Sequence, residues 1–511
     1  MDEGDLQQEE AFEEEAFVEP SGLSFKEFYP VNPPFGFVGI QVDEDTGKAQ
    51  YITFEPTLDE DEDEILESLK EILLNSTDMS LELLNDEEGM EGYLRDKMDR
   101  VFSRYKREVP TESREKFIYY LMRDFLGYGK IDLLMKDPNI EDISCNGVNT
   151  PIYVWHRRHE SLPTNVVYES AERLNFIVTR IVYKTGNQIS IARPILEGTL
   201  PEGYRAHVTL DEVSKRGATF TIRKFQPNPF TIIDLVNFGT ITPKMAAYFW
   251  ILIEHLRSIM VVGSVASGKT SLLNAMCMFI RPEMKVVTIE ETRELRLHEN
   301  WIPLTTRTSF QPGVQEVTLF DLLKSALRQR PDYIIVGEVR GEEAYTLFQS
   351  IAVGHGGLCT AHADSVESII QRLTTRPMNI PRQMLPLMNA FVQIRRVERD
   401  GVVQRKVVGI TELTDVTPDG RLSMQDRFAW EGGDNFNYNR PQERDRNIFN
   451  LISRREHIPF SKLEEELERR AVIIKWMAKS GITSYEEVAG LVRDYYLAPD
   501  EVYNVARRGI V

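Results

Sequence analysis

The sequence predicts an α/β fold whose largest domain contains a mostly parallel sheet. Two observations support this prediction. A strand, a glycine-rich loop and a helix follow one another between Ser258 and Ile280, and from residue 285 to residue 374 short apolar runs alternate with helical patterns. Such alternation is typical of a parallel sheet covered by helices. An α+β domain and an acidic N-terminal region are expected to precede this domain.

The glycine-rich loop matches a phosphate-binding motif. Its residues follow the apolar run Ile259–Val262 and fit the pattern G-x-x-x-x-G-K-[ST]. Backbone N–H groups of such a loop, with the N-terminus of the following helix, surround phosphate oxygens. Lys269 is expected to reach the β- and γ-phosphates, and Thr270 to hold Mg²⁺. The predicted site for ATP and Mg²⁺ comprises Gly263, Ser264, Val265, Ala266, Ser267, Gly268, Lys269, Thr270 and Ser271.

The remaining elements of this domain, residues 237–430, are predicted in chain order. Thr242-Pro243 opens a helix, and Thr318 with Asp321 forms a capping box for another. Asp364 and Glu367 are read as opening a third helix. A hairpin joined at Asp400-Gly401 is expected at the sheet edge, residues 430–450 are expected to be irregular, and the C-terminal region 431–511 to be helical from Ser461 onward. The predicted strands are Lys285–Glu290, Tyr333–Val336, Gly357–Ala361, Phe391–Val397 and Val402–Leu413, and the predicted helices are Thr318–Gln329, Glu342–Val353 and Asp364–Thr374.

The N-terminal part is predicted to contain three segments and a linker. Residues 1–24 are expected to form an acidic, disordered tail, because residues 1–20 hold nine acidic and no basic side chains; a docking segment for a basic partner is the alternative. Residues 25–100 form a hairpin, with strands Phe35–Val42 and Tyr51–Phe54, followed by helices. Residues 101–226 form the α+β domain, and residues 227–236 a linker that serves as a hinge.

Composition and charge narrow the classes of function. The net charge of −20 arises in residues 1–100, which hold 30 acidic and 6 basic residues, so the remaining 50 acidic and 54 basic residues leave +4 elsewhere. No block of basic residues with interleaved aromatics is present, so nucleic acid is not expected as a partner. No apolar stretch is long enough for a membrane span, no secretory signal is present, and Cys145, Cys277 and Cys359 are expected to be reduced and buried in a cytoplasmic protein.

Carboxylates and histidines follow three of the predicted strands. Glu338 ends the strand that begins at Tyr333, where a carboxylate can bind Mg²⁺ or orient water. Glu290, Glu291 and Glu294 follow a second strand, and spacing alone does not choose among them for a base; a solvated charge cluster is the alternative. His355 and His362 lie at the two ends of a third strand, as a γ-phosphate sensor or as structural residues.

Together these motifs resemble the ATPases of the type II/type IV secretion superfamily, over roughly residues 100–430. The P-loop, the acidic box Thr288–Glu294, the sequence Gly337–Arg340 and the histidine box His355–His362 occur in the family's order. Segments Gly127–Leu134, Asp137–Gly147, Arg193–Gly198 and Pro201–Arg205 resemble its N-terminal domain. Glu291 replaces a usual Asp, the loop reads Ser-Val-Ala-Ser where bacterial members usually have Pro-Thr-Gly-Ser, and the four-cysteine zinc module is absent, which indicates the archaeal branch.

The resemblance implies a RecA-like ATPase domain and a set of residue roles. Glu294 would be the catalytic base, Glu338 would organise Mg²⁺ and water, and His362 with His355 would couple phosphate state to movement. Arginines of the N-terminal domain would act across the nucleotide, with Arg205, Arg216 and Arg223 as candidates.

The resemblance also implies a homo-hexamer that hydrolyses ATP with Mg²⁺. It would power protein secretion or assembly of a type IV pilus-like filament, bound peripherally at the cytoplasmic face of the membrane through a polytopic platform protein. The alternatives are a nucleic-acid motor of conjugative type and a nucleotide-gated scaffold without hydrolysis.

Overall fold

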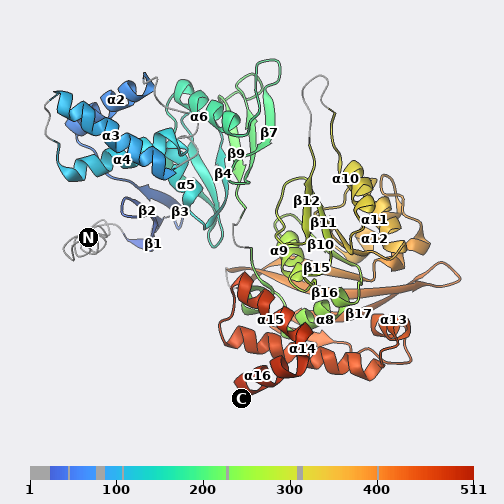
Figure 1. The fold of residues 1–511 in the computed structure, drawn as a ribbon. Coiled ribbons are helices and arrows are strands. Elements are labelled where there is room, and N and C mark those ends of the chain that lie inside the picture. The colour runs from blue at the N-terminus through green and yellow to red at the C-terminus, as the bar shows by residue number, and fades with distance from the viewer. Residues whose placement is uncertain are drawn as a thin grey trace. The chain divides into compact units, whose positions relative to one another are not determined.

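A computed structural model of the 511-residue chain describes residues 24–43, 46–75, 87–105, 109–225, 229–307, 315–399 and 402–510. The acidic tail predicted for residues 1–24, apart from Ser24, and the turn residues Asp45, Asp400 and Gly401 lie outside these ranges. The chain divides into two units, residues 1–226 and 227–511 (Figure 1). Within the described ranges no helix combines the length and the apolar character that crossing a bilayer requires.

The first unit is built around a nine-stranded sheet with the strand order β1-β2-β3-β6-β5-β4-β9-β8-β7. Helices α2, α3 and α4 share one apolar cluster, and α6 packs its apolar face on the sheet. The strands are β1 (Phe25–Asn32), β2 (Gly36–Val42), β3 (Ala49–Phe54), β4 (Ile140–Cys145), β5 (Pro151–His156), β6 (Glu160–Val167), β7 (Ile195–Thr199), β8 (Arg205–Thr209) and β9 (Thr219–Arg223). The helices are α2 (Glu60–Leu74), α3 (Glu87–Tyr105), α4 (Thr111–Phe125), a short 3₁₀ helix (Gly129–Ile131), α5 (Asp132–Lys136) and α6 (Ala171–Lys184).

The N-terminal hairpin is continuous with this sheet. Strands β2 and β3 pair antiparallel as the sequence predicts, and β3 joins β6 at Tyr51 and Thr164. Strand β1 was not expected from the sequence; it carries Pro30 and lies at the sheet edge, where a residue without an N–H is tolerated. The hydroxyls of Tyr29 and Tyr51 each donate to Asp137 Oδ2 at 2.7 Å, which ties the hairpin to the rest of the unit.

The second unit contains a second nine-stranded sheet, with the order β12-β11-β13-β14-β10-β15-β16-β17-β18. The strands from β12 to β15 run parallel, and β16, β17 and β18 extend the sheet in antiparallel fashion. The predicted α/β, RecA-like fold class is confirmed. The strands are β10 (Ile259–Gly263), β11 (Val286–Glu290), β12 (Trp301–Thr305), β13 (Tyr333–Val336), β14 (Gly356–His362), β15 (Ala390–Arg399), β16 (Val402–Val416), β17 (Leu422–Gly432) and β18 (Asn435–Tyr438).

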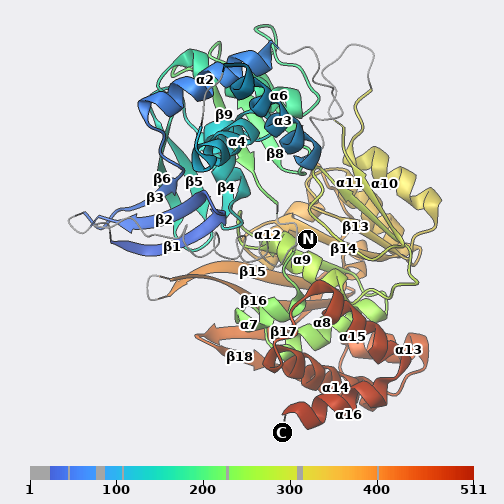
Figure 2. The same ribbon diagram turned by 60° about the vertical axis from the view of Figure 1, so that its left-hand side comes forward.

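Helices cover both faces of this sheet. Alternate residues of β10 enter different cores: Ile259 and Val261 pack with α8, α9 and the C-terminal helices, whereas Met260 and Val262 pack with α10, α11 and α12. Figures 1 and 2 show α14 beside α8 and α16 beside α14. The helices are α7 (Ile232–Asn237), α8 (Pro243–Glu254), α9 (Lys269–Cys277), α10 (Leu319–Ala326), α11 (Glu343–Ala352), α12 (Val366–Thr374), α13 (Ile448–Glu456), α14 (Phe460–Lys479), α15 (Tyr485–Leu497) and α16 (Pro499–Ile510), with 3₁₀ helices at Leu327–Gln329 and Arg382–Leu387.

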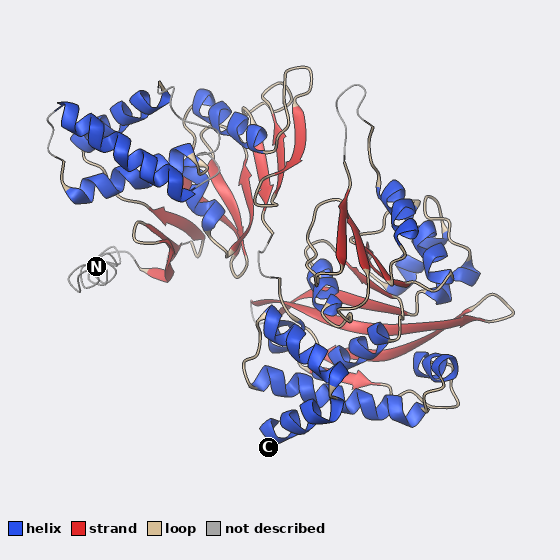
Figure 3. Cartoon of the chain, viewed as in Figure 1, coloured by secondary structure: helices blue, strands red, loops and turns tan. Residues whose placement is uncertain are grey.

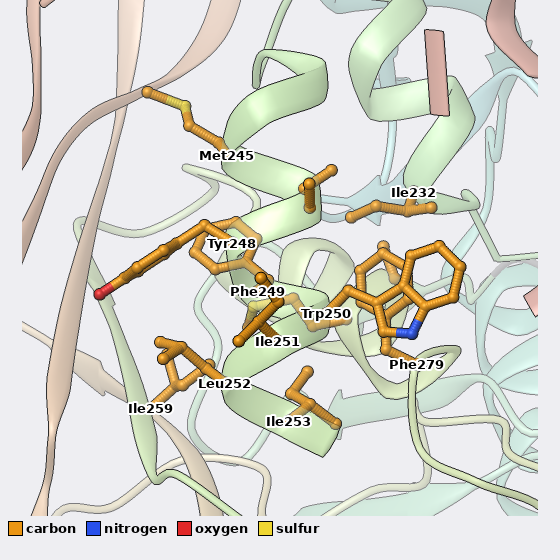
Figure 4. Packing of buried hydrophobic residues seen from close by; sticks show 14 of the residues in the cluster. Ile232, Met245, Tyr248, Phe249, Trp250, Ile251, Leu252, Ile253, Ile259 and Phe279 are labelled. Atoms are coloured by element: carbon orange, nitrogen blue, oxygen red, sulfur yellow. The ribbon is translucent and has the colours of Figure 1, made fainter. Parts of the chain in front are cut away.

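Helix α8 is the centre of the larger core. Every residue from Met245 to Ile253 is fully buried, because neighbouring helices and the sheet cover the whole circumference (Figure 4). The rings of Trp250 and Phe279 stack with centroids 5.1 Å apart, and the indole N–H donates to the Tyr496 hydroxyl at 2.7 Å. The C-terminal helices therefore belong to the same core as the P-loop strand.

The structure differs from the sequence-based expectation at four places. The hairpin β15–β16 lies inside the sheet and not at its edge, because β17 and β18 continue the sheet beyond it. The long strands β15 and β16 stand out in Figure 3. Residues 430–450, expected to be irregular, include β18 and the start of α13. The expected linker 227–236 contains most of α7, whose Ile232 and Ile233 are buried in the core. Ser365, not Asp364, caps α12 and accepts from the N–H of Ser368.

Candidate nucleotide-binding and catalytic site

The P-loop occupies the turn between β10 and α9. Gly263 must be a glycine because a Cβ there would lie 2.5 Å from the Ile394 carbonyl oxygen. Gly268, at φ +91°, adopts a backbone conformation that favours glycine and offers no side chain to cap α9. An N-terminus without a side-chain cap retains N–H donors for an anion.

Two side chains bend back onto the loop itself. Ser267 Oγ and Lys269 Nζ both donate to the Ser264 carbonyl oxygen, at 2.9 Å and 2.8 Å. Lys269 is thereby held over the loop that its sequence motif assigns to phosphate. Thr270 and Ser271 follow in the first turn of α9, half-buried.

Glu338 lies two residues beyond the end of β13 and interacts with the P-loop lysine. Burial alone would raise the pKa of its carboxyl, but the hydrogen bond from Arg340 at 2.7 Å, and then the charges of Arg340, Lys269 and His362, hold that pKa below its usual range. His362 ends β14 and pairs in register with Gly263. The structure thus brings Lys269, Glu338 and His362 together, and it keeps the carboxylate ionised.

The three glutamates of the acidic box have different surroundings. Glu290, at the end of β11, is buried, and its Oε1 accepts from the N–H groups of Glu294 and Leu295 at 2.9 Å and 3.1 Å. Burial raises the pKa of Glu290 to about 7. Glu291 is exposed and pairs with Arg340 at 3.3 Å, whereas Glu294 is half-buried on the segment that Glu290 holds. Glu294 is the base that the family resemblance implies, and this role stays a prediction.

His355 lies apart from the P-loop. It precedes β14, at the end of the strand opposite to His362, and its Nδ1 is 2.7 Å from the Pro331 carbonyl oxygen. The neighbouring Gly356 pairs with Tyr333, which begins β13. The structure therefore separates the two histidines that the sequence analysis grouped.

The three candidate arginines belong to the first unit. Arg205 on β8 is paired with Glu197 and lies opposite Arg223 of β9 in the register. Arg216, in the connection between these strands, is exposed, and its carbonyl accepts from the N–H of Val148 at 2.9 Å. Their action on a nucleotide remains a prediction.

One arginine that contacts the P-loop carries no signal in the sequence. Arg405 of β16 donates from Nε to the Ala266 carbonyl oxygen at 3.2 Å. No local motif marks this residue, because a contact between residues 139 positions apart depends on how β15 and β16 pair.

The oxygen donors fit Mg²⁺. Mg²⁺ is usually held by one or two protein oxygens together with waters and substrate phosphates. Thr270 and the ionised Glu338 offer such oxygens near Lys269. Across the described ranges, no three or more His, Cys, Asp or Glu side chains are grouped as a metal site of their own.

Comparison with known proteins identifies the family. A model described as type II/IV secretion system protein matches residues 137–399. An uncharacterized protein of Methanocaldococcus jannaschii is 35% identical over 505 residues, which cover 92% of this chain and 88% of that protein. The type IV secretion system protein PtlH homolog of Bordetella bronchiseptica is 30% identical over 48% of this chain and 80% of its own length. Among solved structures, the VirB11 ATPase from the Brucella suis type IV secretion system matches 55% of this chain and 94% of its own, at 24% identity and a TM-score of 0.28. The chain therefore belongs to the type II/IV secretion system protein family.

Proposed function

We propose that this protein hydrolyses ATP with Mg²⁺ and uses the free energy to power protein secretion or the assembly of a type IV pilus-like filament. The observation that carries the proposal is the joint placement of the P-loop lysine Lys269, the ionised carboxylate Glu338 and His362 at the carboxyl ends of adjacent strands. Ligands of open α/β sheets bind at this edge.

Each group has a chemical task in this proposal. The N–H groups of the P-loop and the ammonium of Lys269 stabilise the negative charge that develops on the transferring phosphoryl group. Thr270 and Glu338 hold Mg²⁺, which neutralises phosphate charge when bound. Glu294 orients the attacking water and accepts its proton. His362, beside Glu338, registers whether the γ-phosphate is present.

The quaternary and cellular parts of the proposal rest on family membership. The protein acts as a homo-hexamer at the cytoplasmic face of a membrane and attaches there through a polytopic platform protein. Arg205, Arg216 and Arg223 supply positive charge to a bound nucleotide, and movement about the hinge predicted for residues 227–236 transmits the work. The names of the relatives, which include type IV secretion proteins, support an export machine.

Phosphate release from ATP tests the hydrolysis. We expect the full chain to release phosphate in the presence of Mg²⁺ and Lys269→Ala to lose at least 99% of the rate, since removal of one such electrostatic group costs about 100-fold or more. A Lys269→Ala protein that works at the wild-type rate would contradict the proposed site.

Mixing two inactive variants tests the ring. Arg216→Ala keeps its P-loop, and Lys269→Ala keeps its arginine. If the site is shared between subunits, the mixture regains activity, and the specific activity of the wild type rises with protein concentration. If mixing restores nothing with Arg216, Arg205 or Arg223 and specific activity is constant, each chain works alone.

A further inference from the structure

Ala266, in the middle of the P-loop, adopts an unfavourable backbone conformation. Its φ is +57°, in the left-handed region, although it carries a Cβ. Residues other than glycine, asparagine and aspartate rarely adopt this region because their Cβ crowds the backbone. Some contact must therefore hold this peptide in place, and the loop's own hydrogen bonds from Ser267 and Lys269 end on Ser264 instead.

Arg405 makes a contact with this peptide. Its Nε donates to the Ala266 carbonyl oxygen at 3.2 Å. Its side chain also lies across the next part of the loop, since a Cβ added at Gly268 would be 3.2 Å from Arg405 Cδ. A guanidinium donor gives a charge-assisted hydrogen bond, which is stronger than a neutral one.

The sheet fixes the position of Arg405. Strand β15 runs parallel to β10, with Gln393 beside Val262 just before the loop begins. Strand β16 returns along β15 and places Arg405 opposite Arg396. A bulge between Gln393 and Ile394 shifts the β15–β16 register by one residue, and a one-residue shift exchanges the faces on which side chains lie. Arg405 is thereby delivered to the P-loop from a rigid element of the same chain.

We propose that Arg405 is a positioning residue that holds the P-loop in its phosphate-binding conformation by fixing the Ala266 peptide. It acts through the loop and not on the nucleotide. The inference rests on the proposed function, because it assumes that this loop binds a nucleotide phosphate. It predicts that Arg405 strengthens nucleotide binding only while position 266 carries a Cβ, since glycine adopts the left-handed region without a steric penalty.

The test is a double-mutant cycle read by nucleotide affinity. The dissociation constant of ADP with Mg²⁺ is measured by titration calorimetry on the full chain for wild type, Arg405→Ala, Ala266→Gly and the double variant. We expect Arg405→Ala to weaken ADP binding about tenfold, equivalent to about 1.4 kcal/mol. In the Ala266→Gly background, the same change is expected to weaken binding by less than about twofold.

Kinetics and controls separate positioning from other roles. Arg405→Ala is expected to raise KM for ATP about tenfold while kcat falls less than twofold, because the side chains assigned to the transferring phosphoryl group and to Mg²⁺, Lys269, Thr270 and Glu338, are unchanged. The matched control is Arg421→Ala, which removes an exposed arginine paired with Asp419 in the turn between β16 and β17, and it is expected to change neither constant. Thermal melts confirm that each variant is folded.

Each other outcome overturns the inference in a recognisable way. If Arg405→Ala weakens binding equally in both backgrounds, Arg405 acts on the nucleotide itself. If Arg405→Ala binds ADP as the wild type does, the contact has no role in binding. A wild type that binds neither ADP nor ATP overturns the proposed function, and the inference with it.

Discussion

The acidic-box residue Glu290 makes stability depend on pH. Glu290 is 3% exposed. Within the described part of the chain, its Oε2 is buried and has no hydrogen-bond partner. Burial raises its pKa from 4.5 to about 7, which exceeds the lowering effect of the N–H groups of Glu294 and Leu295. Between about pH 4.5 and pH 7 the folded protein therefore holds a proton that the unfolded chain has already released.

The size and sign of the effect follow from this difference. Below pH 4.5 the carboxyl is protonated in both states, so its contribution to stability is fully present; it is lost as pH rises towards 7. Glu290→Gln keeps an acceptor for the two N–H groups but does not ionise. We expect the variant to exceed the wild type in unfolding free energy by about 1 kcal/mol at pH 5 and about 3 kcal/mol at pH 8.

Thermal unfolding without nucleotide is the assay. A gain of about 3 kcal/mol corresponds to an increase in Tm of about 6 °C for a unit of this size. Glu299→Gln, an exposed carboxylate on the same connection, is the control and is expected to change stability by less than about 0.5 kcal/mol at both pH values. The reasoning is refuted if Glu290→Gln has the same Tm as the wild type at pH 8, or if its advantage does not grow between pH 5 and pH 8.

Two further predictions compare matched pairs of variants. Glu412 and Arg427 form an ion pair in the core, 2.9 Å apart, with side chains that are 1% and 2% exposed. Glu412→Gln leaves the guanidinium charge of Arg427 uncompensated, so we expect the free energy of unfolding, measured with denaturant, to fall by about 3–5 kcal/mol. Asp419→Asn breaks an exposed pair and is expected to change stability by less than about 1 kcal/mol; equal effects of the two changes would contradict this assignment. His362→Ala is expected to lower the rate of phosphate release at least tenfold and His355→Ala far less, because only His362 lies beside Glu338; the reverse order would show that His355 reaches a site in another way.

The parts of the fold that local sequence determines were predictable. The P-loop unit needs only an apolar strand, glycines at two positions and a following helix, all within Ile259–Cys277. The capping residues Thr242 and Thr318 act on N–H groups three positions away, and the structure shows both contacts.

The parts that depend on distant pairing were not predictable in the same way. Strand β18 is only four residues long, Asn435–Tyr438, and is stabilised by pairing with β17, so the sequence alone does not mark it as a strand. Arg405 reaches the P-loop only through the register of β15 and β16. The burial of Glu290 likewise depends on the strands on both sides of β11, which spacing along the chain does not reveal.

The separation of the two histidines shows a further limit. The sequence places His355 and His362 at opposite ends of one strand, and the motif alone does not decide whether both histidines reach the P-loop. The parallel register of β14 with β10, in which His362 lies beside Gly263, decides the question.

The most direct test of the catalytic account is phosphate release by Glu338→Gln, with ADP affinity measured on the same sample. Gln has the shape of Glu without its charge, and the P-loop is unchanged. The account predicts that ADP with Mg²⁺ still binds within about fivefold of the wild type, while ATP hydrolysis falls at least about 100-fold. A variant that hydrolyses ATP within about twofold of the wild-type rate would contradict the assignment of Glu338 and the site built around it.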